Sequence, residues 1–173
     1  LWAVQTVRAI PNWRDNEVLA SYSLKQSPND ASLHVAQADT LQFRHGDLDA
    51  AAREFETALR LNSTSLHPMA SVTYSSYLGL GLIAQQKGRA EEALTYFQKA
   101  VRLLPQRSPA YDFLGAFYFP RKDYAKAAEA FAQAVRANPY DLIARFHLGT
   151  CWLKLGKYRE AAEQFHAARE VDP

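Results

Sequence analysis

The stretch that decides the fold is 108–141, SPAYDFLGAFYFPRKDYAKAAEAFAQAVRANPYD. Its small and aromatic residues recur on both sides at a constant step, which equals the length of the stretch itself. Five classes of position keep this step: Leu80-Gly81, Leu114-Gly115 and Leu148-Gly149; Ala93, Ala127 and Ala161; Phe97, Phe131 and Phe165; Ala100, Ala134 and Ala168; Pro105, Pro139 and Pro173. A fixed period in the range of roughly 20–50 residues indicates a stack of similar structural units.

Each unit is expected to be a pair of antiparallel helices. The repeating glycines Gly81, Gly115 and Gly149 lack a side chain, which lets the second helix lie close against the first. We expect the alanines Ala93, Ala127 and Ala161 to receive that contact. The phenylalanines Phe97, Phe131 and Phe165 are expected to fill the space between units, each stabilising the fold by roughly 1.5–3 kcal/mol.

This pattern resembles the tetratricopeptide repeat family, which reads aromatic-x-x-Leu-Gly-x-x-aromatic, then Ala-x-x-x-Phe-x-x-Ala, then Pro. The unit 108–141 matches throughout, with Tyr111 and Tyr118 at the aromatic positions. Unit 74–107 has Ala84 for its second aromatic, and unit 142–173 has Arg145 for its first. The resemblance implies an all-α fold: a right-handed superhelical solenoid of antiparallel helix pairs, with about 3.5–4 repeats and an N-terminal helix.

An earlier unit, 32–65, keeps Ala51, Phe55 and Ala58 but not the leucine–glycine pair. We expect Ala38-Asp39 to replace that pair. Residues 1–30 are expected to be an N-terminal segment with a capping helix that ends at Gln26, and 31–173 to be the solenoid. Asp15 is a suitable N-cap for this helix.

Three departures from the period predict local structure. Ala58 and Ala100 are farther apart than one step, and the eight extra residues predict a longer connection around 66–69 and a long first helix over about 69–87. Pro120 lies where its helix is ending and is expected to stop it early. Three further glycines are expected to end first helices in a left-handed conformation: Gly46, Gly88 and Gly156.

The sequence carries no signature of chemistry. It has no glycine-rich phosphate loop, no nucleophile elbow and no histidine pair at metal-ligand spacing. Cys151 and Trp152 are explained by helix packing. We therefore expect no catalytic residue, no cofactor and no metal. A net charge of +2 gives no reason to expect nucleic acid, and no apolar run reaches the ~18 residues of a membrane span.

The resemblance places recognition on the inner wall, which is formed by the first helix of each unit. The positions of the family pattern that face inward are unusually apolar here. The expected groove residues are Phe43, Leu78, Leu82, Asp112, Phe119, Phe146 and Leu153. The Lys/Asn/Arg clamp that some family members use to hold carboxylate tails is not matched. The expected partner is therefore an apolar helix or extended segment of a protein or peptide.

Several alternatives stay open. The groove is equally compatible with the chain's own N-terminal segment or with a second copy, and the last helix offers an uncovered face for self-association. The Trp13-Arg14-Asp15 entry also resembles the junction before the repeat tail of polytopic membrane mannosyltransferase-like proteins. That resemblance implies a regulatory tail in the periplasm or lumen, instead of the cytoplasm. A chain that starts at Leu1 is expected to be a piece of a longer protein, and a sugar-binding role for Trp2 and Trp13 is the remaining alternative.

Overall fold

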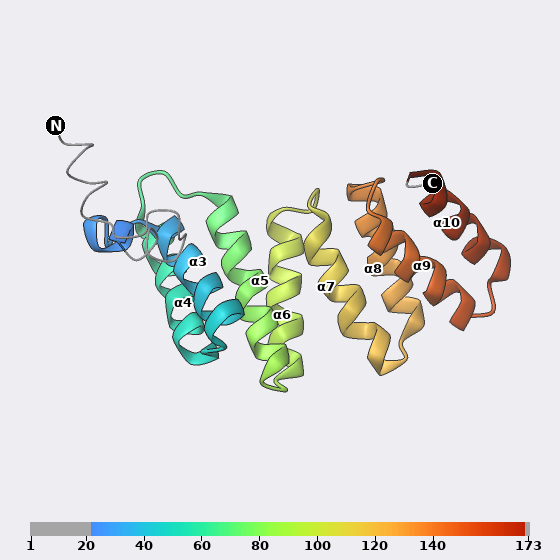
Figure 1. The fold of residues 1–173 in the computed structure, drawn as a ribbon, viewed down its shortest axis with the longest axis horizontal. Coiled ribbons are helices and arrows are strands. Elements are labelled where there is room, and N and C mark those ends of the chain that lie inside the picture. Colours follow the sequence, from blue (N-terminus) through green and yellow to red (C-terminus); the bar gives the residue numbers. More distant parts are fainter. Residues whose placement is uncertain (1–21, 172–173) are drawn as a thin grey trace. The chain divides into compact units, whose positions relative to one another are not determined.

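The computed structural model describes residues 22–171, with side chains described to Arg169 (Figure 1). Within that range the chain is built of helices and short turns and contains no strand, which confirms the all-α expectation. The chain divides into two compact units, 1–89 and 90–173, each described by itself below. No helix among the described residues is both long and apolar enough to cross a membrane.

Unit 1 contains the end of the N-terminal helix, α3, η1, α4 and α5. Residues 22–26 are helical, so the expected helix end at Gln26 is observed, whereas its start at Asp15 lies outside the described residues. The other bounds are α3 (Ala31–Thr40), the π-helical turn η1 (Leu41–His45), α4 (Leu48–Thr64) and α5 (Ala70–Gln86). Helix α4 packs against both α3 and α5, around a core of Ala31, Ala58 and Val72.

Unit 2 contains five α-helices in the described range, and neighbours in sequence are neighbours in space (Figure 1). They are α6 (Ala90–Leu103), α7 (Ser108–Tyr118) with the 3₁₀ turn η2 (Phe119–Arg121), α8 (Tyr124–Ala137), α9 (Leu142–Lys154) and α10 (Tyr158–Val171). Aspartate N-caps start α8 and α9, where Asp123 and Asp141 accept from the amides of Lys126 and Ala144. One hydrophobic core cluster of this unit lies between α8 and α9.

The repeating phenylalanines pack in two directions. Within its own helix pair, the Phe131 ring lies so close to Gly115 that a Cβ placed there would be 2.6 Å from the ring. Towards the next helix, the same ring stacks on His147 with centroids 5.1 Å apart. Phe97 stacks in the same way on Phe113, at 5.4 Å. The atoms nearest to Gly115 thus belong to Phe131. Ala127 is fully buried in the same helix as Phe131.

The eight extra residues are spread over four places. The long first helix is confirmed, since α5 has 17 residues with Met69 and Lys87 as its caps. Helix α4 is also longer than α6, with 17 residues against 14. The connection 65–69 is one residue longer than 104–107, and the turn after α5 takes up one more. The expected long connection therefore accounts for little of the insertion.

A buried amide ties this connection down. Asn62 is 3% exposed. Its Nδ2 donates to the carbonyl of Met69 and to the Thr73 hydroxyl, both at 2.9 Å. Its Oδ1 accepts from the Met69 amide at 2.8 Å. The Asn62 side chain therefore satisfies the backbone at the start of α5, a helix that has no side-chain cap of its own.

The segment between the N-cap aspartate and the helix-stop glycine is one residue longer in the first repeat, 32–65, than in the last, 142–173. Its flanking residues Asp30 and Gly46 are 16 positions apart, whereas Asp141 and Gly156 are 15 apart. The turn η1 takes up the extra residue, because a π-helical turn is wider than an α-helical one.

This shift corrects the expected alignment of the leucine–glycine pair. The pair is replaced by Gln37-Ala38, and the expectation of Ala38-Asp39 is wrong by one residue. Ala38 is fully buried, as the position facing the second helix requires, while Asp39 is exposed.

The early end of α7 at Pro120 is confirmed, since α7 stops at Tyr118 and Pro120 lies in the short turn η2. The three expected helix-stop glycines have φ between 68° and 74°, in the left-handed region. In the repeat 108–141, which has no such glycine, Lys122 takes the same conformation with φ 62°. A side chain at this conformation is strained, whereas glycine is not.

Lys122→Gly is therefore expected to raise the free energy of unfolding by about 0.5–1 kcal/mol. The reverse change, Gly156→Ala, is expected to lower it by about 1 kcal/mol, and its Cβ would meet nothing within 4 Å. Urea unfolding followed by circular dichroism measures both. Equal stability of Lys122→Gly and the wild type would show that the left-handed position is not strained.

Candidate functional site

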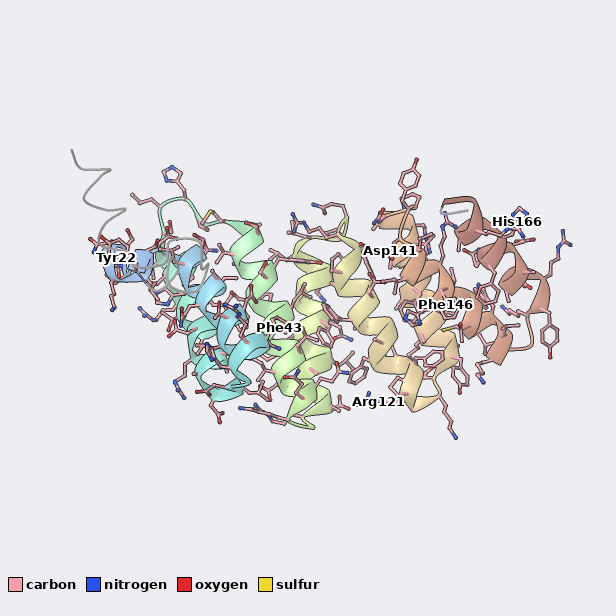
Figure 2. The ribbon with its side chains drawn as sticks, in the orientation of Figure 1. Tyr22, Phe43, Arg121, Asp141, Phe146 and His166 are labelled. Carbon is pink, nitrogen blue, oxygen red and sulfur yellow. The ribbon has the colours of Figure 1, made fainter. Side chains whose placement is uncertain are left out.

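The structure divides the expected groove residues between the two units, as Phe43 and Phe146 illustrate (Figure 2). Phe43 on η1 is 67% exposed. Leu78 and Leu82 lie on α5, where both are half-buried. The remaining four belong to unit 2: Asp112, Phe119, Phe146 and Leu153. Phe119 packs against the α8–α9 core, so little of its ring is available to a partner.

Helix α9 carries three exposed large apolar side chains, of which Phe146 and Leu153 belong to the expected groove. Ile143, Phe146 and Leu153 are 69%, 58% and 44% exposed. They are separated by three and seven residues, which places them along one side of the helix; we name them the α9 face. Thr150 lies between them, and its hydroxyl donates to the Phe146 carbonyl within the helix at 2.8 Å. The Phe146 ring is supported by Phe165 of α10, with centroids 5.7 Å apart.

Asp112 is the charged member of the set. Its Oδ1 is buried and has no hydrogen-bond partner among the described residues. Burial, followed by repulsion from Asp141, raises the pKa of Asp112 to about 7. A half-buried carboxylate without a partner is unusual, and sequence reasoning placed this residue correctly on the first helix of its unit without detecting its environment.

The pKa of Asp112 predicts a pH dependence of stability. Because the folded value of about 7 exceeds the ordinary 3.8, the folded state keeps a proton that the unfolded state releases between these pH values. The free energy of unfolding therefore falls as the pH rises from about 4 to about 7 and stays lower above that. Asp112→Asn should be more stable than the wild type by about 1–2 kcal/mol at pH 8, and nearly equal to it at pH 4. Thermal unfolding at both pH values measures this, and a difference independent of pH would contradict it.

Cys151 does not have the environment of a reactive thiol. Cys151 is fully buried against Ala127 and Phe131, and burial raises the pKa of its thiol to about 11. A thiol in this state is not a nucleophile at neutral pH. No group of three or more metal-ligating side chains gathers among the described residues.

Sequence reasoning missed two matching ties between paired helices. Arg145 donates from Nε to the Pro139 carbonyl at 2.9 Å and from Nη1 to Gln164 at 3.5 Å. In unit 1, the His34 ring lies between the Pro28 carbonyl and the Glu54 carboxylate, at 2.9 and 2.6 Å. In each case a side chain of the first helix of the pair joins the turn before that helix to the second helix, which is α10 for Arg145 and α4 for His34. The Arg145 substitution therefore replaces aromatic packing with hydrogen bonds.

The α7–α8 pair has no such tie, because Ala130 stands where α4 has Glu54 and α10 has Gln164. A recess of about 320 Å³ is found between these helices, lined by Tyr111, Leu114, Tyr118, Lys126, Glu129, Ala130 and Gln133. None of its lining residues belongs to the expected groove.

Gln42 occupies the second aromatic position of the repeat 32–65. It is 5% exposed, and its side-chain amide has no hydrogen-bond partner among the described residues.

The family model for the tetratricopeptide repeat matches residues 35–108 and 121–173, more than half of the chain. The chain belongs to the tetratricopeptide repeat family. It is 28% identical over 120 residues to human superkiller complex protein 3, covering 69% of this chain and 8% of that protein. It is 30% identical over 129 residues to the general transcriptional corepressor trfA of Dictyostelium discoideum, covering 73% and 9%. The chain thus spans a small part of the length of these curated relatives.

Solved tetratricopeptide structures share the fold. MamA superposes with a TM-score of 0.70 at 23% identity, covering 88% of this chain and 84% of MamA. YrrB, described as a TPR protein with an unusual peptide-binding site, gives 0.68 at 27% identity, covering 89% and 75%. PilF of Pseudomonas aeruginosa gives 0.72 at 23% identity, covering 89% and 66%. Tetratricopeptide repeats are protein-interaction modules and generally non-catalytic scaffolds.

Proposed function

We propose that this tetratricopeptide chain is a non-catalytic interaction module and that its α9 face binds an apolar helix or extended peptide. The observation that carries the proposal is the exposure of Ile143, Phe146 and Leu153 along one side of α9. Contiguous apolar surface left in water is unfavourable, and on soluble domains it commonly marks an interaction site.

The dimensions of the α9 face favour a segment over a small molecule. Ile143 and Leu153 are ten residues apart on one helix, which corresponds to about 15 Å. That length matches roughly three turns of a partner helix or five residues of an extended strand. The aromatic ring of Phe146 lies between the other two members of the face, and aromatic side chains are frequent anchors at binding interfaces.

The test is selection of random dodecapeptides displayed on phage against the purified chain, followed by affinity measurement with labelled synthetic peptides. We expect enriched apolar peptides whose affinity falls at least tenfold, equivalent to about 1.4 kcal/mol, in Phe146→Glu and in Leu153→Glu. A carboxylate at either position would be desolvated by the bound segment without a partner.

The matched control is Tyr158→Glu, because Tyr158 is an aromatic residue that is 70% exposed on another helix, α10. This variant should keep the affinity of the wild type. Loss of affinity in all three variants alike would indicate non-specific apolar adhesion and contradict the proposal. Leu78→Glu and Phe43→Glu test in the same assay whether unit 1 contributes a second contact surface.

A further inference from the structure

Asp112 differs from the aspartates at the helix starts of this chain. Asp30, Asp47, Asp123 and Asp141 each accept a hydrogen bond from a backbone amide near a helix start. Asp112 is the fifth residue of α7, where the backbone amides are already used within the helix. Its Oδ1 is buried with no partner in the described part of the chain. Helix capping therefore does not explain this carboxylate.

The surroundings of Asp112 are acidic and apolar. Asp141, which directly precedes α9, is the described charged group that acts on it, and its effect is repulsive. Arg145, one turn further along α9, is held by the Pro139 carbonyl and by Gln164. No cation is among the groups that act on Asp112, and the repulsion from Asp141 places Asp112 close to the start of α9.

Residues at the equivalent position of the repeat show that the fold does not need a carboxylate there. The constant step along the repeat gives Leu78 in α5 and Phe146 in α9. An apolar side chain at this position would avoid the cost of burying a charge without a partner. A carboxylate here is explained if a charge of opposite sign reaches it from outside the chain.

We propose that the segment bound on the α9 face carries a lysine or arginine whose cationic group pairs with Asp112. This inference rests on the proposed function and names the chemistry of the partner: an apolar peptide with one basic residue towards the N-terminal end of α9. Asp112 is half-buried, so the solvent-facing side of its carboxylate could accept a charge-assisted hydrogen bond that offsets the charge for which the chain provides no partner. The basic residue also distinguishes such a segment from purely apolar competitors.

Binding of this kind depends on pH. A cation favours the charged form of a neighbouring carboxylate, so binding the basic segment displaces the proton that Asp112 holds below its pKa of about 7. Affinity for a lysine peptide should rise between pH 5.5 and pH 8, while affinity for the same peptide with glutamine in place of lysine should stay constant. Asp141 is the described charged group whose repulsion adds to the pKa of Asp112.

The experiment is the phage selection at pH 8, run in parallel on the wild type, Asp112→Asn and Asp112→Leu. Peptides from the wild type should combine apolar residues with one lysine or arginine, and peptides from both variants should be apolar without the basic preference. One selected peptide and its Lys→Gln form are then measured on all three proteins. The substitution should weaken binding at least tenfold on the wild type and less than twofold on the variants.

Each outcome decides one of the two proposals. Apolar peptides that depend on Phe146 but show no basic preference overturn the pairing with Asp112 and leave the proposed function intact. A basic preference that persists in both Asp112 variants also overturns the pairing. If no recovered peptide depends on Phe146, the proposed function itself fails. Two variants are used because Asn keeps the shape of the side chain, while Leu is the residue that α5 carries at this position.

Discussion

Phe131→Ala is expected to lower the free energy of unfolding by about 3–5 kcal/mol. The Phe131 ring is 2% exposed, lies against Gly115 and stacks on His147. Removing it leaves a cavity between α7, α8 and α9, and Gly115 has no side chain that could fill it. Urea unfolding followed by circular dichroism measures the loss.

Phe165→Ala is the matched control for this prediction. Phe165 has the same place in its repeat and faces Gly149 as Phe131 faces Gly115, but its ring is half-buried. Its loss is expected to be about 1–2 kcal/mol, since the stabilisation from burial follows the apolar area removed from water. Equal losses at the two positions would mean that the stack on the following helix contributes nothing.

Asn62→Ala is expected to lower the free energy of unfolding by about 2–4 kcal/mol. The change removes three hydrogen bonds and leaves the Met69 amide and carbonyl without their side-chain partner. Hydrogen exchange should accelerate most at the first amides of α5, because they lose the residue that fixes the preceding connection.

Asn138→Ala provides the comparison for Asn62, since Asn138 occupies the equivalent place at the end of α8. Its side chain is exposed and makes one bond of 3.3 Å to the Tyr140 amide. We expect a change below about 0.5 kcal/mol there. A comparable loss in the two variants would show that the role of Asn62 is generic to helix ends.

The helix pairs could be predicted from the sequence because their determinants are local and repeat. The constant step, the stop at Pro120 and the length of α5 all follow from residue type and spacing. The extra residue in η1 was missed because one insertion inside a helix changes neither composition nor capping. It could have been found: Pro28 aligns with Pro139 at a separation of 111, whereas Gly46 aligns with Gly156 at 110.

The environment of the site residues could not be predicted in the same way. Position in the repeat assigns Asp112 to the first helix of its unit, but the lack of a partner depends on which side chains of other helices come near it. The hydrogen bonds of Asn62 likewise depend on the path of the connection 65–69, for which the repeat offers no template. The two hydrogen bonds of Arg145 depend on the turn before α9 and on α10, which its place at an aromatic position of the repeat does not specify.

Because Cys151 is buried, its reactivity can report separation of the helices that enclose it. It is the single cysteine of the sequence, and its thiol is enclosed between α8 and α9 with its pKa raised to about 11. A maleimide dye can therefore react only in molecules whose α8–α9 contact has separated. The labelling rate at neutral pH would measure how often this one contact opens, without any engineered probe.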